Sequence, residues 1–554
     1  MKQIQLSHRR KLSSSLPAIL FWITAALSLC TTYYVTGHFL DSDTSSTLAF
    51  AEHLAGIGKL FSQDWMYSTS IEVVDCHLVY MPLFYLLDNW QHVRLIGTII
   101  LQTLYVLSYA FMLRQAGVSK RIFYISSTLI LLPISVAHGR IVLYHCYYIP
   151  LLVVDFLVLG LVFRCAKADN WKRPGPYLSV ITLGVLSFLG GCGGIRQLMI
   201  AHAPMVLSAF LFCFLDFYKY EKNISEILTS DRTRILFFSV LSAGASFVGF
   251  LVNVGYLCKR FSFTDYGSTG LHILNFAELD DVLYGFFHQF GFREQVNMIS
   301  VIGIISLLGL IAGIYCVYAS IQTIKRYKKE DNIYITLLSI FFLFFTGVTL
   351  FSFLVTGGDA GYYYPLYFTF CISWAAPFLI ISHEKVAAKK GFSFEKIFSW
   401  ITVFTLLING FANMTFFNGS KAFDQIYEGL CFYEPEKKEN LSGAAEYLTE
   451  NDYHIGYATY WEGNVTTEIT NGDIRMINLL MGGENGNLVY YDWLTSLYLR
   501  EVENPKPFLL LPADFQQYFE RSDSYQYCTL VYSDSYHCVY DILDREAFIP
   551  TLYS

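Results

Sequence analysis

The chain has 554 residues, of which 54% are hydrophobic and only 15% are charged. Soluble domains carry about a quarter charged residues, and each charged side chain in the bilayer core costs roughly 2.5–3.5 kcal/mol. The composition therefore excludes a soluble protein. The net charge of −7, without a basic stripe along the chain, also excludes a nucleic-acid-binding protein.

Eleven apolar runs are long enough to cross a membrane, because about 20 helical residues span the hydrocarbon core. The predicted spans are 17–37, 93–113, 121–138, 143–163, 177–195, 197–218, 235–257, 297–320, 333–355, 364–382 and 397–415. The first run is too long for a signal peptide, and no small-residue cleavage site follows it. We therefore expect an α-helical polytopic membrane protein with about 11 transmembrane helices.

Lysine and arginine mark one side of this bundle. They precede the first span and follow spans two, four, six, eight and ten, as at Arg10, Arg114, Arg173, Lys325 and Lys389. Cytoplasmic loops are rich in Lys and Arg, so an odd number of spans places all of these residues in the cytoplasm. The sequence predicts a plasma-membrane protein with a cytoplasmic N-terminus and an extracytoplasmic C-terminal domain.

The chain is predicted to divide into a transmembrane domain, residues 1–415, and a C-terminal domain, residues 416–554. Short alternating runs and turn signals in the second part indicate a small α+β fold. Within the outer loop 38–92, apolar residues recur on one face of 44–61, which predicts an amphipathic helix on the outer leaflet. Cys528 and Cys538 flank a tyrosine-rich stretch and could form a hairpin disulfide.

An acidic pair, Asp41 and Asp43, follows the first span directly, at the predicted outer surface of the membrane. Two carboxylates two residues apart can share one site. One can act as a general base while the other positions a substrate or a divalent metal ion. The alternative is that Asp43 or Thr44 merely caps the N-terminus of the helix that follows.

This arrangement resembles the GT-C superfamily of membrane glycosyltransferases, which includes protein O-mannosyltransferases and the lipid A aminoarabinose transferase. The resemblance rests on an acidic pair after the first span, a surface helix behind it, many spans and an outer C-terminal domain. It implies transfer of a sugar from a polyprenyl-phosphate donor to a hydroxyl of a glycan, lipid or protein acceptor. It also implies that Asp41 or Asp43 is the acidic catalytic residue. The superfamily includes metal-dependent and metal-independent members.

A phosphodiester donor calls for cationic side chains in the outer cavity, and arginine suits phosphate oxygens best. Arg196 follows a glycine-rich run, 190–194, between the fifth and sixth predicted spans. An arginine at membrane depth or at its rim is a candidate for a functional site. The alternative is an interfacial arginine that snorkels from a tight turn.

Two further clusters are candidates for substrate binding. His138, Arg140 and His145 lie at the predicted outer ends of the third and fourth spans, where they could contact phosphate or acceptor, or cap the helix ends. Tyr362 and Tyr363 precede a proline in a late outer turn, and their hydroxyls could bind sugar or phosphate. Superfamily members often have an arginine in this late turn, and this sequence has none. An aromatic belt is the alternative for the tyrosines.

Other functions remain open from the sequence. A flippase or transporter for lipid-linked sugars would need polar groups through the bundle or matched broken helices, and Asp155, inside the fourth span, is a single candidate that a structural hydrogen bond would also explain. A non-catalytic envelope-assembly protein with the same architecture is a third possibility. The aromatic segment 457–464 is interpreted either as a carbohydrate-facing surface or as a strand in the core of the C-terminal domain.

Overall fold

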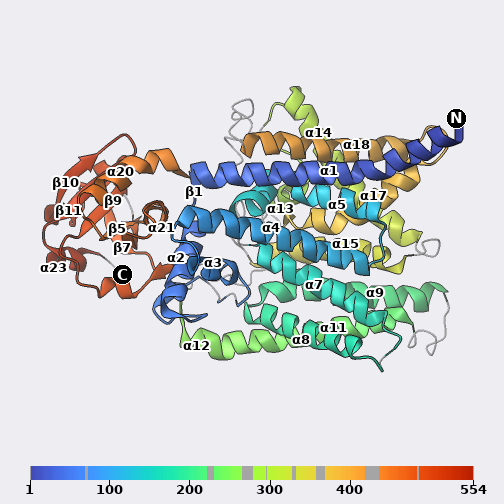
Figure 1. The fold of residues 1–554 in the computed structure, drawn as a ribbon, viewed down its shortest axis with the longest axis horizontal. Helices are drawn as coiled ribbons and strands as arrows, with labels where there is room; N and C mark the ends of the chain where they lie inside the picture. The colour runs from blue at the N-terminus through green and yellow to red at the C-terminus, as the bar shows by residue number, and fades with distance from the viewer. Residues whose placement is uncertain are drawn as a thin grey trace.

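The protein consists of a long helical bundle with a mixed α/β domain at one end (Figure 1). The computed structural model describes residues 2–68, 71, 73–146, 148–170, 172–220, 230–264, 279–294, 296–326, 332–356, 368–417, 436–482 and 486–552. The N-terminus lies at the end of the bundle that is remote from the C-terminal domain (Figure 1).

The bundle is built from long apolar helices. Nine helices of the described chain are long and apolar enough to cross a membrane, and a bent pair would make ten. The protein is therefore an integral membrane protein. The long helices are α1 (Lys2–His38), α4 (Trp90–Gln115), α7 (Ile149–Ala166), α8 (Pro174–Cys192), α9 (Ala203–Tyr220), α11 (Asp231–Val252), α14 (Val301–Lys325), α15 (Ile333–Thr356) and α18 (Phe394–Phe417).

Two predicted spans differ from the structure. The third, 121–138, is a bent pair in which α5 (Lys120–Leu131) meets α6 (Val136–Gly139) and the π-helical turn η1 (Arg140–His145) at 96°. Pro133 lies at this break, where it cannot continue the hydrogen bonding of α5. The tenth, 364–382, falls partly outside the described residues and partly on α17 (Cys371–Ala387), whose 17 residues are at the lower limit for a span.

Helices α8 and α11 approach each other closely because small residues line their interface. A Cβ atom at Gly191 would overlap the backbone of Ser246, and one at Gly249 would overlap the backbone of Phe188. Between these points the Ser187 hydroxyl lies 2.7 Å from the Ser242 hydroxyl. Small residues and interhelical hydroxyl bonds are the usual means of helix packing within membranes.

The C-terminal domain contains a six-stranded sheet in the order β10-β11-β9-β5-β6-β7. The central strands β5, β6 and β9 are parallel, and the outer pairs are antiparallel. The helices are α20 (Lys438–Glu450) and α21 (Tyr460–Ile469), and the strands are β5 (Ile455–Thr459), β6 (Arg475–Gly482), β7 (Asn487–Tyr490), β9 (Phe508–Pro512), β10 (Cys528–Ser533) and β11 (His537–Ile542).

The two faces of this sheet bury separate cores, as strand alternation requires. Phe508 and Leu510 of β9 pack with residues of α20 and α21, whereas Leu509 and Leu511 face the short helices α22 (Gln516–Phe519) and α23 (Arg545–Phe548). The predicted disulfide is wrong. Both cysteines are free, because the hairpin register places Cys528 opposite Ile542 and Cys538 opposite Ser533, too far apart along the strands for a bond.

The outer loop joins the bundle to the C-terminal domain through strands and helix α2 (Ser42–Ile57). Strand β1 (Phe39–Leu40), directly after α1, pairs with β4 (Glu436–Lys437), and β2 (Trp65–Tyr67) pairs with β3 (Ser262–Phe263) and β8 (Thr495–Ser496). Helix α2 was expected to lie on the outer leaflet. In the structure α2 packs against α3 (His77–Phe84) and α21, with Ser42 and Ser45 bonded to α21, and its place relative to the membrane stays a prediction.

Candidate active site

The acidic pair lies at the first turn of α2. Asp41 is the N-cap, and its carboxylate accepts a hydrogen bond of 3.0 Å from the backbone N–H of Thr44. Asp43 follows in the first helical turn. The amide groups of a helix N-terminus favour negative charge, so both carboxylates occupy a place where the helix stabilises their ionised forms. The N-cap of α2 is therefore Asp41, whereas the sequence indicated Asp43 or Thr44 as the cap, and the role of Asp43 is left to be explained.

Asp43 is held by a residue from the C-terminal domain. The Tyr460 hydroxyl donates a hydrogen bond of 2.6 Å to Asp43 Oδ1. Tyr460 is the first residue of α21, and its own carbonyl accepts a hydrogen bond of 2.5 Å from the Ser42 hydroxyl. These two bonds fix the start of α21 against the start of α2.

The surroundings of Asp43 raise the pKa of its carboxyl group toward neutral pH. Burial and the charge of Asp41 raise the pKa of Asp43 to about 7, while the Tyr460 hydrogen bond and the positive charge of Arg140 lower it. The ordinary pKa of aspartate is near 4. A carboxylate with a pKa close to 7 is suited to general acid–base chemistry at physiological pH.

A buried ion pair supports the other end of α21. Arg94, at the start of α4, lies 3.1 Å from Glu468, with side-chain exposures of 0% and 4%. Arg94 also donates to the Phe39 carbonyl, and Ser45 donates to the second carboxylate oxygen of Glu468 at 2.5 Å. The guanidinium lies 5.1 Å from the centre of the Tyr144 ring. This network joins α2, α4, η1 and α21 around the acidic pair.

The broken segment after α5 brings one predicted residue to the acidic pair. Arg140, the first residue of η1, is buried, and its charge acts on Asp43. His138 is also buried, and its backbone N–H is capped by the Ser135 hydroxyl. The backbone of His145 belongs to η1, and its side chain lies outside the described residues.

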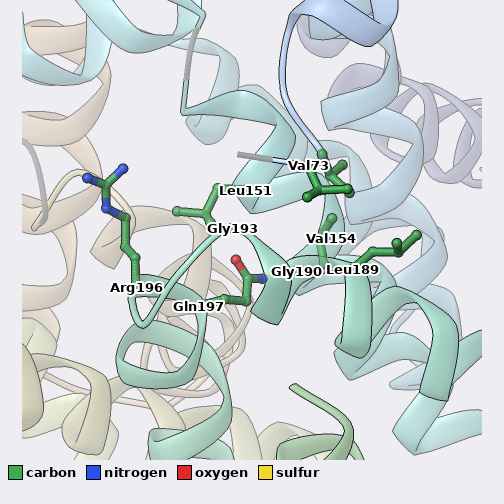
Figure 2. A pocket seen from close by; sticks show the side chains of 9 residues that line it. Val73, Leu151, Val154, Leu189, Gly190, Gly193, Arg196 and Gln197 are labelled. Atoms are coloured by element: carbon green, nitrogen blue, oxygen red, sulfur yellow. The ribbon is translucent and has the colours of Figure 1, made fainter. Parts of the chain in front are cut away.

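Arg196 lies at a separate pocket, where its guanidinium is 5.5 Å from the centre of the Tyr148 ring. Gln197, Gly190 and Gly193 also line this pocket. Figure 2 shows Arg196 on one side, with the apolar residues Val73, Val154 and Leu189 on the other. Tyr148 comes shortly after η1, the turn whose first residue, Arg140, acts on Asp43.

The other residues named from the sequence either lie outside the described residues or make contacts within the helical bundle. Tyr362 and Tyr363 lie outside the described residues. Asp155 accepts a hydrogen bond from the Gln197 amide, as expected of a structural role. His202 pairs with Ser242, and Asn253 donates to the Cys192 carbonyl, so these polar groups also connect helices within the bundle.

Comparisons with known proteins identify the architecture. No family model matches the sequence, and no curated protein matches it. The oligosaccharyltransferase of Archaeoglobus fulgidus, tethered with an acceptor peptide containing the NVT sequon, is similar over 90% of this chain and 69% of its own, with 11% identity and a TM-score of 0.51. ArnT from Cupriavidus metallidurans, bound to undecaprenyl phosphate, is similar over 96% of this chain and 99% of its own, with 11% identity and a TM-score of 0.50.

Both neighbours are membrane glycosyltransferases of the GT-C superfamily. The chain has the GT-C fold. The fold predicted from the sequence is thereby confirmed.

The pair offers few ligands for a metal. The described part of the chain holds no group of three or more His, Cys, Asp or Glu side chains placed to bind a metal ion. One oxygen of Asp41 accepts from Thr44, and one of Asp43 accepts from Tyr460. Since Mg²⁺ is often held by one or two carboxylates together with water and substrate phosphate, Asp41 and Asp43 fit at most such a shared site. The chemistry proposed below uses no metal.

Sequence reasoning did not connect three residues to the acidic pair. Arg94 is a charge at the start of the second predicted span, which by itself marks a candidate site. Tyr460 lies in the aromatic segment 457–464 and Glu468 follows it, and the carbohydrate-facing interpretation of that segment stays a prediction. The contacts of these two residues with α2 and α4 arise only in the tertiary fold.

Proposed function

We propose that this protein transfers a sugar from a polyprenyl-phosphate donor to an acceptor hydroxyl at the outer face of the membrane. The main observation behind this proposal is the partly buried Asp43, whose pKa is about 7 and which the positive charge of Arg140 influences. Asp43 belongs to α2, at the end of the bundle that bears the C-terminal domain. The GT-C fold supports the reaction class. ArnT is bound to undecaprenyl phosphate in its crystal structure, which supports this class of donor.

The chemistry follows from the charges. The acceptor hydroxyl oxygen attacks the anomeric carbon, and its proton passes to Asp43. The bond between the anomeric carbon and the phosphate oxygen breaks, and the polyprenyl phosphate leaves with the bonding electrons. Arg140 neutralises the negative charge that develops on that phosphate. Attack opposite the leaving group inverts the anomeric centre.

Arg196 suits a second contact with the donor. Its pocket combines a guanidinium with an apolar wall formed by Val73, Leu151, Val154 and Leu189. A polyprenyl phosphate is complementary to this pocket, because it carries an anion next to a hydrocarbon chain. Segment 140–148 would then lie along the donor, with Arg140 near the reacting phosphate and Tyr148 near Arg196.

The proposal also includes the orientation. The N-terminus lies at one end of the bundle, and β1, α2 and the C-terminal domain lie at the opposite end. With a cytoplasmic N-terminus, the reaction occurs outside, where lipid-linked sugars rather than nucleotide sugars serve as donors. The plasma membrane is the corresponding location, and the boundary near residue 415 separates the two proposed domains.

Purified protein reconstituted into liposomes with radiolabelled polyprenyl-phosphate sugars tests the proposal. We expect wild type to transfer label or to release free sugar slowly, and Asp43→Asn to reduce turnover by about 100- to 10,000-fold while remaining folded. Asp41→Asn should have a smaller effect, since Asp41 caps α2. The matched control is Asp88→Asn, an exposed residue of the same outer loop. A folded Asp43→Asn variant with wild-type turnover would contradict the proposal, as would a wild type that moves intact donor across the bilayer without cleaving it.

A further inference from the structure

The contact between Tyr460 and Asp43 joins the two parts of the chain at the reacting carboxylate. The hydroxyl–carboxylate distance is 2.6 Å, as expected for a charge-assisted hydrogen bond from a hydroxyl to a carboxylate. The two residues are 417 positions apart. The C-terminal domain therefore reaches the acidic pair with a side chain as well as with its backbone.

Tyr460 is held rigidly. Its side chain is buried, and its ring packs edge-on against Trp461 and Tyr491, with centroids 5.1 and 5.3 Å away. Its carbonyl is bonded to Ser42, and the far end of α21 is fixed through Glu468. A phenol so constrained can hold its partner carboxylate in one orientation.

We propose that Tyr460 is a positioning residue that holds Oδ1 of Asp43, so that Oδ2 is presented to the acceptor hydroxyl and the C-terminal domain is an integral part of the active site. This inference rests on the proposed function of Asp43. It assigns Tyr460 no contact with substrate. It also gives the C-terminal domain a role in every turnover, beyond any binding of acceptor.

The charges around Asp43 support this role. Three groups act on it, namely Asp41 at the start of its own helix, Tyr460 of α21 and Arg140 of η1. Burial and the charge of Asp43 hold the pKa of Tyr460 well above its ordinary range, so the phenol remains a donor at every physiological pH. Because its hydrogen bond lowers the pKa of Asp43, removal of the phenol must raise that pKa.

The C-terminal domain supplies a matched control. Tyr453 is also buried, and its hydroxyl also donates to an aspartate, Asp541, away from the acidic pair. Tyr453→Phe and Tyr460→Phe each remove one tyrosine–aspartate hydrogen bond from the same domain. A merely structural role predicts the same phenotype for both.

The experiment measures kcat and KM against pH for full-length wild type, Tyr460→Phe and Tyr453→Phe, with melting temperature as the test of folding. For Tyr460→Phe we expect kcat to fall about 10- to 100-fold with little change in KM, and the acidic limb of the profile to move up by about one pH unit. Tyr453→Phe should keep the wild-type profile. Ser42→Ala removes the hydrogen bond to the Tyr460 carbonyl and should move the acidic limb in the same direction by a smaller amount. This variant replaces Tyr460→Phe as the test if Tyr460→Phe does not fold.

An infrared titration separates this inference from the proposed function. The carboxyl stretch of protonated Asp43 is identified by its loss in Asp43→Asn, and it can be followed in protein without any turnover. A titration midpoint that is higher in Tyr460→Phe than in wild type supports the inference even if no donor is cleaved. An unchanged midpoint, an unchanged pH profile, or equal effects of Tyr453→Phe and Tyr460→Phe would overturn it.

Discussion

Two buried carboxylates of this protein occupy opposite settings. Asp43 lies at the junction of α2 and α21, among a second carboxylate, a phenol and a guanidinium. Asp155 lies fully buried in α7, where the described partner is the neutral amide of Gln197. The junction therefore gathers charges that can respond to a substrate, whereas the bundle interior uses polar groups to connect helices.

The same contrast extends to the residues around them. At the junction, Glu468 joins Arg94 and Ser45 from two other helices in a buried network of charges. In the bundle, Ser187 and Ser242 join α8 to α11 through neutral hydroxyls, beside glycines that allow close approach. Chemistry is expected at the first place and stability at the second, which leads to paired predictions.

The largest expected difference is between the two aspartates. Asp155→Asn keeps the size of the side chain and the bond to Gln197, so we expect turnover within a few-fold of wild type. Asp43→Asn loses the proton acceptor, and its turnover should fall by at least about 100-fold. Transfer assays on both variants at equal melting temperature measure the difference. A folded Asp155→Asn protein without activity would break the comparison and favour a role for the bundle carboxylate.

Next in size is the loss of the buried ion pair. Glu468→Gln leaves Arg94 buried without its charge partner, which should destabilise the junction by about 3–5 kcal/mol. Glu52→Gln is the matched control, because the Glu52–Arg475 pair also joins α2 to the C-terminal domain but is 27–32% exposed, and it should cost about 0–1 kcal/mol. Limited proteolysis of the C-terminal domain at increasing denaturant concentration measures the loss of stability in each variant. Equal costs would show that burial does not set the strength of the junction.

A smaller effect is expected within the bundle. Gly191→Ala places a methyl group against the backbone of Ser246 and should destabilise the packing of α8 on α11 by about 1–3 kcal/mol. Gly184→Ala, on the same helix with open space around its Cβ position, should leave stability unchanged. Thermal unfolding in detergent compares the two variants. Activity per folded molecule should stay near wild type in both, and its selective loss in Gly191→Ala would contradict the separation of the two regions.

The smallest predicted effect is the response to pH. Asp43 must be ionised to accept a proton, and it is ionised above its pKa of about 7 and neutral below it. Turnover should therefore fall about tenfold per pH unit below pH 7 and level off above it. The measurement is turnover against pH for wild type and for the residual activity of Asp43→Asn, and the acidic limb should be absent from the variant. A limb near pH 4 would mean that Asp43 has an ordinary carboxyl pKa.

The elements that follow from local patterns could be predicted from the sequence. Length and hydropathy predicted the bundle, and the place of Asp41 and Asp43 after the first span indicated the site. The break at Pro133 was missed because both sides of it are apolar, so hydropathy remains high through a 96° bend. The span count of eleven therefore stays a prediction beside the nine or ten spans of the described residues.

The partners of the acidic pair could not be predicted, because they come from contacts between distant parts of the chain. Helix α2 has serines on the face toward α21, which resembles a solvated face when the C-terminal domain is unknown. Ser42 and Ser45 instead bind Tyr460 and Glu468. One sequence without its tertiary contacts does not distinguish a polar surface from a polar interface.

The distance in sequence between Asp43 and Tyr460 also determines when the site can form. The tyrosine is synthesised 417 positions after Asp43. At about 5–20 residues per second, the ribosome needs roughly 20–80 s to bridge that interval. A nascent or truncated chain thus carries the acidic pair in the membrane without its tyrosine. The proposed site is complete only after the C-terminal domain has folded against α2, so the proposed activity can begin only once both parts of the chain have been made and joined.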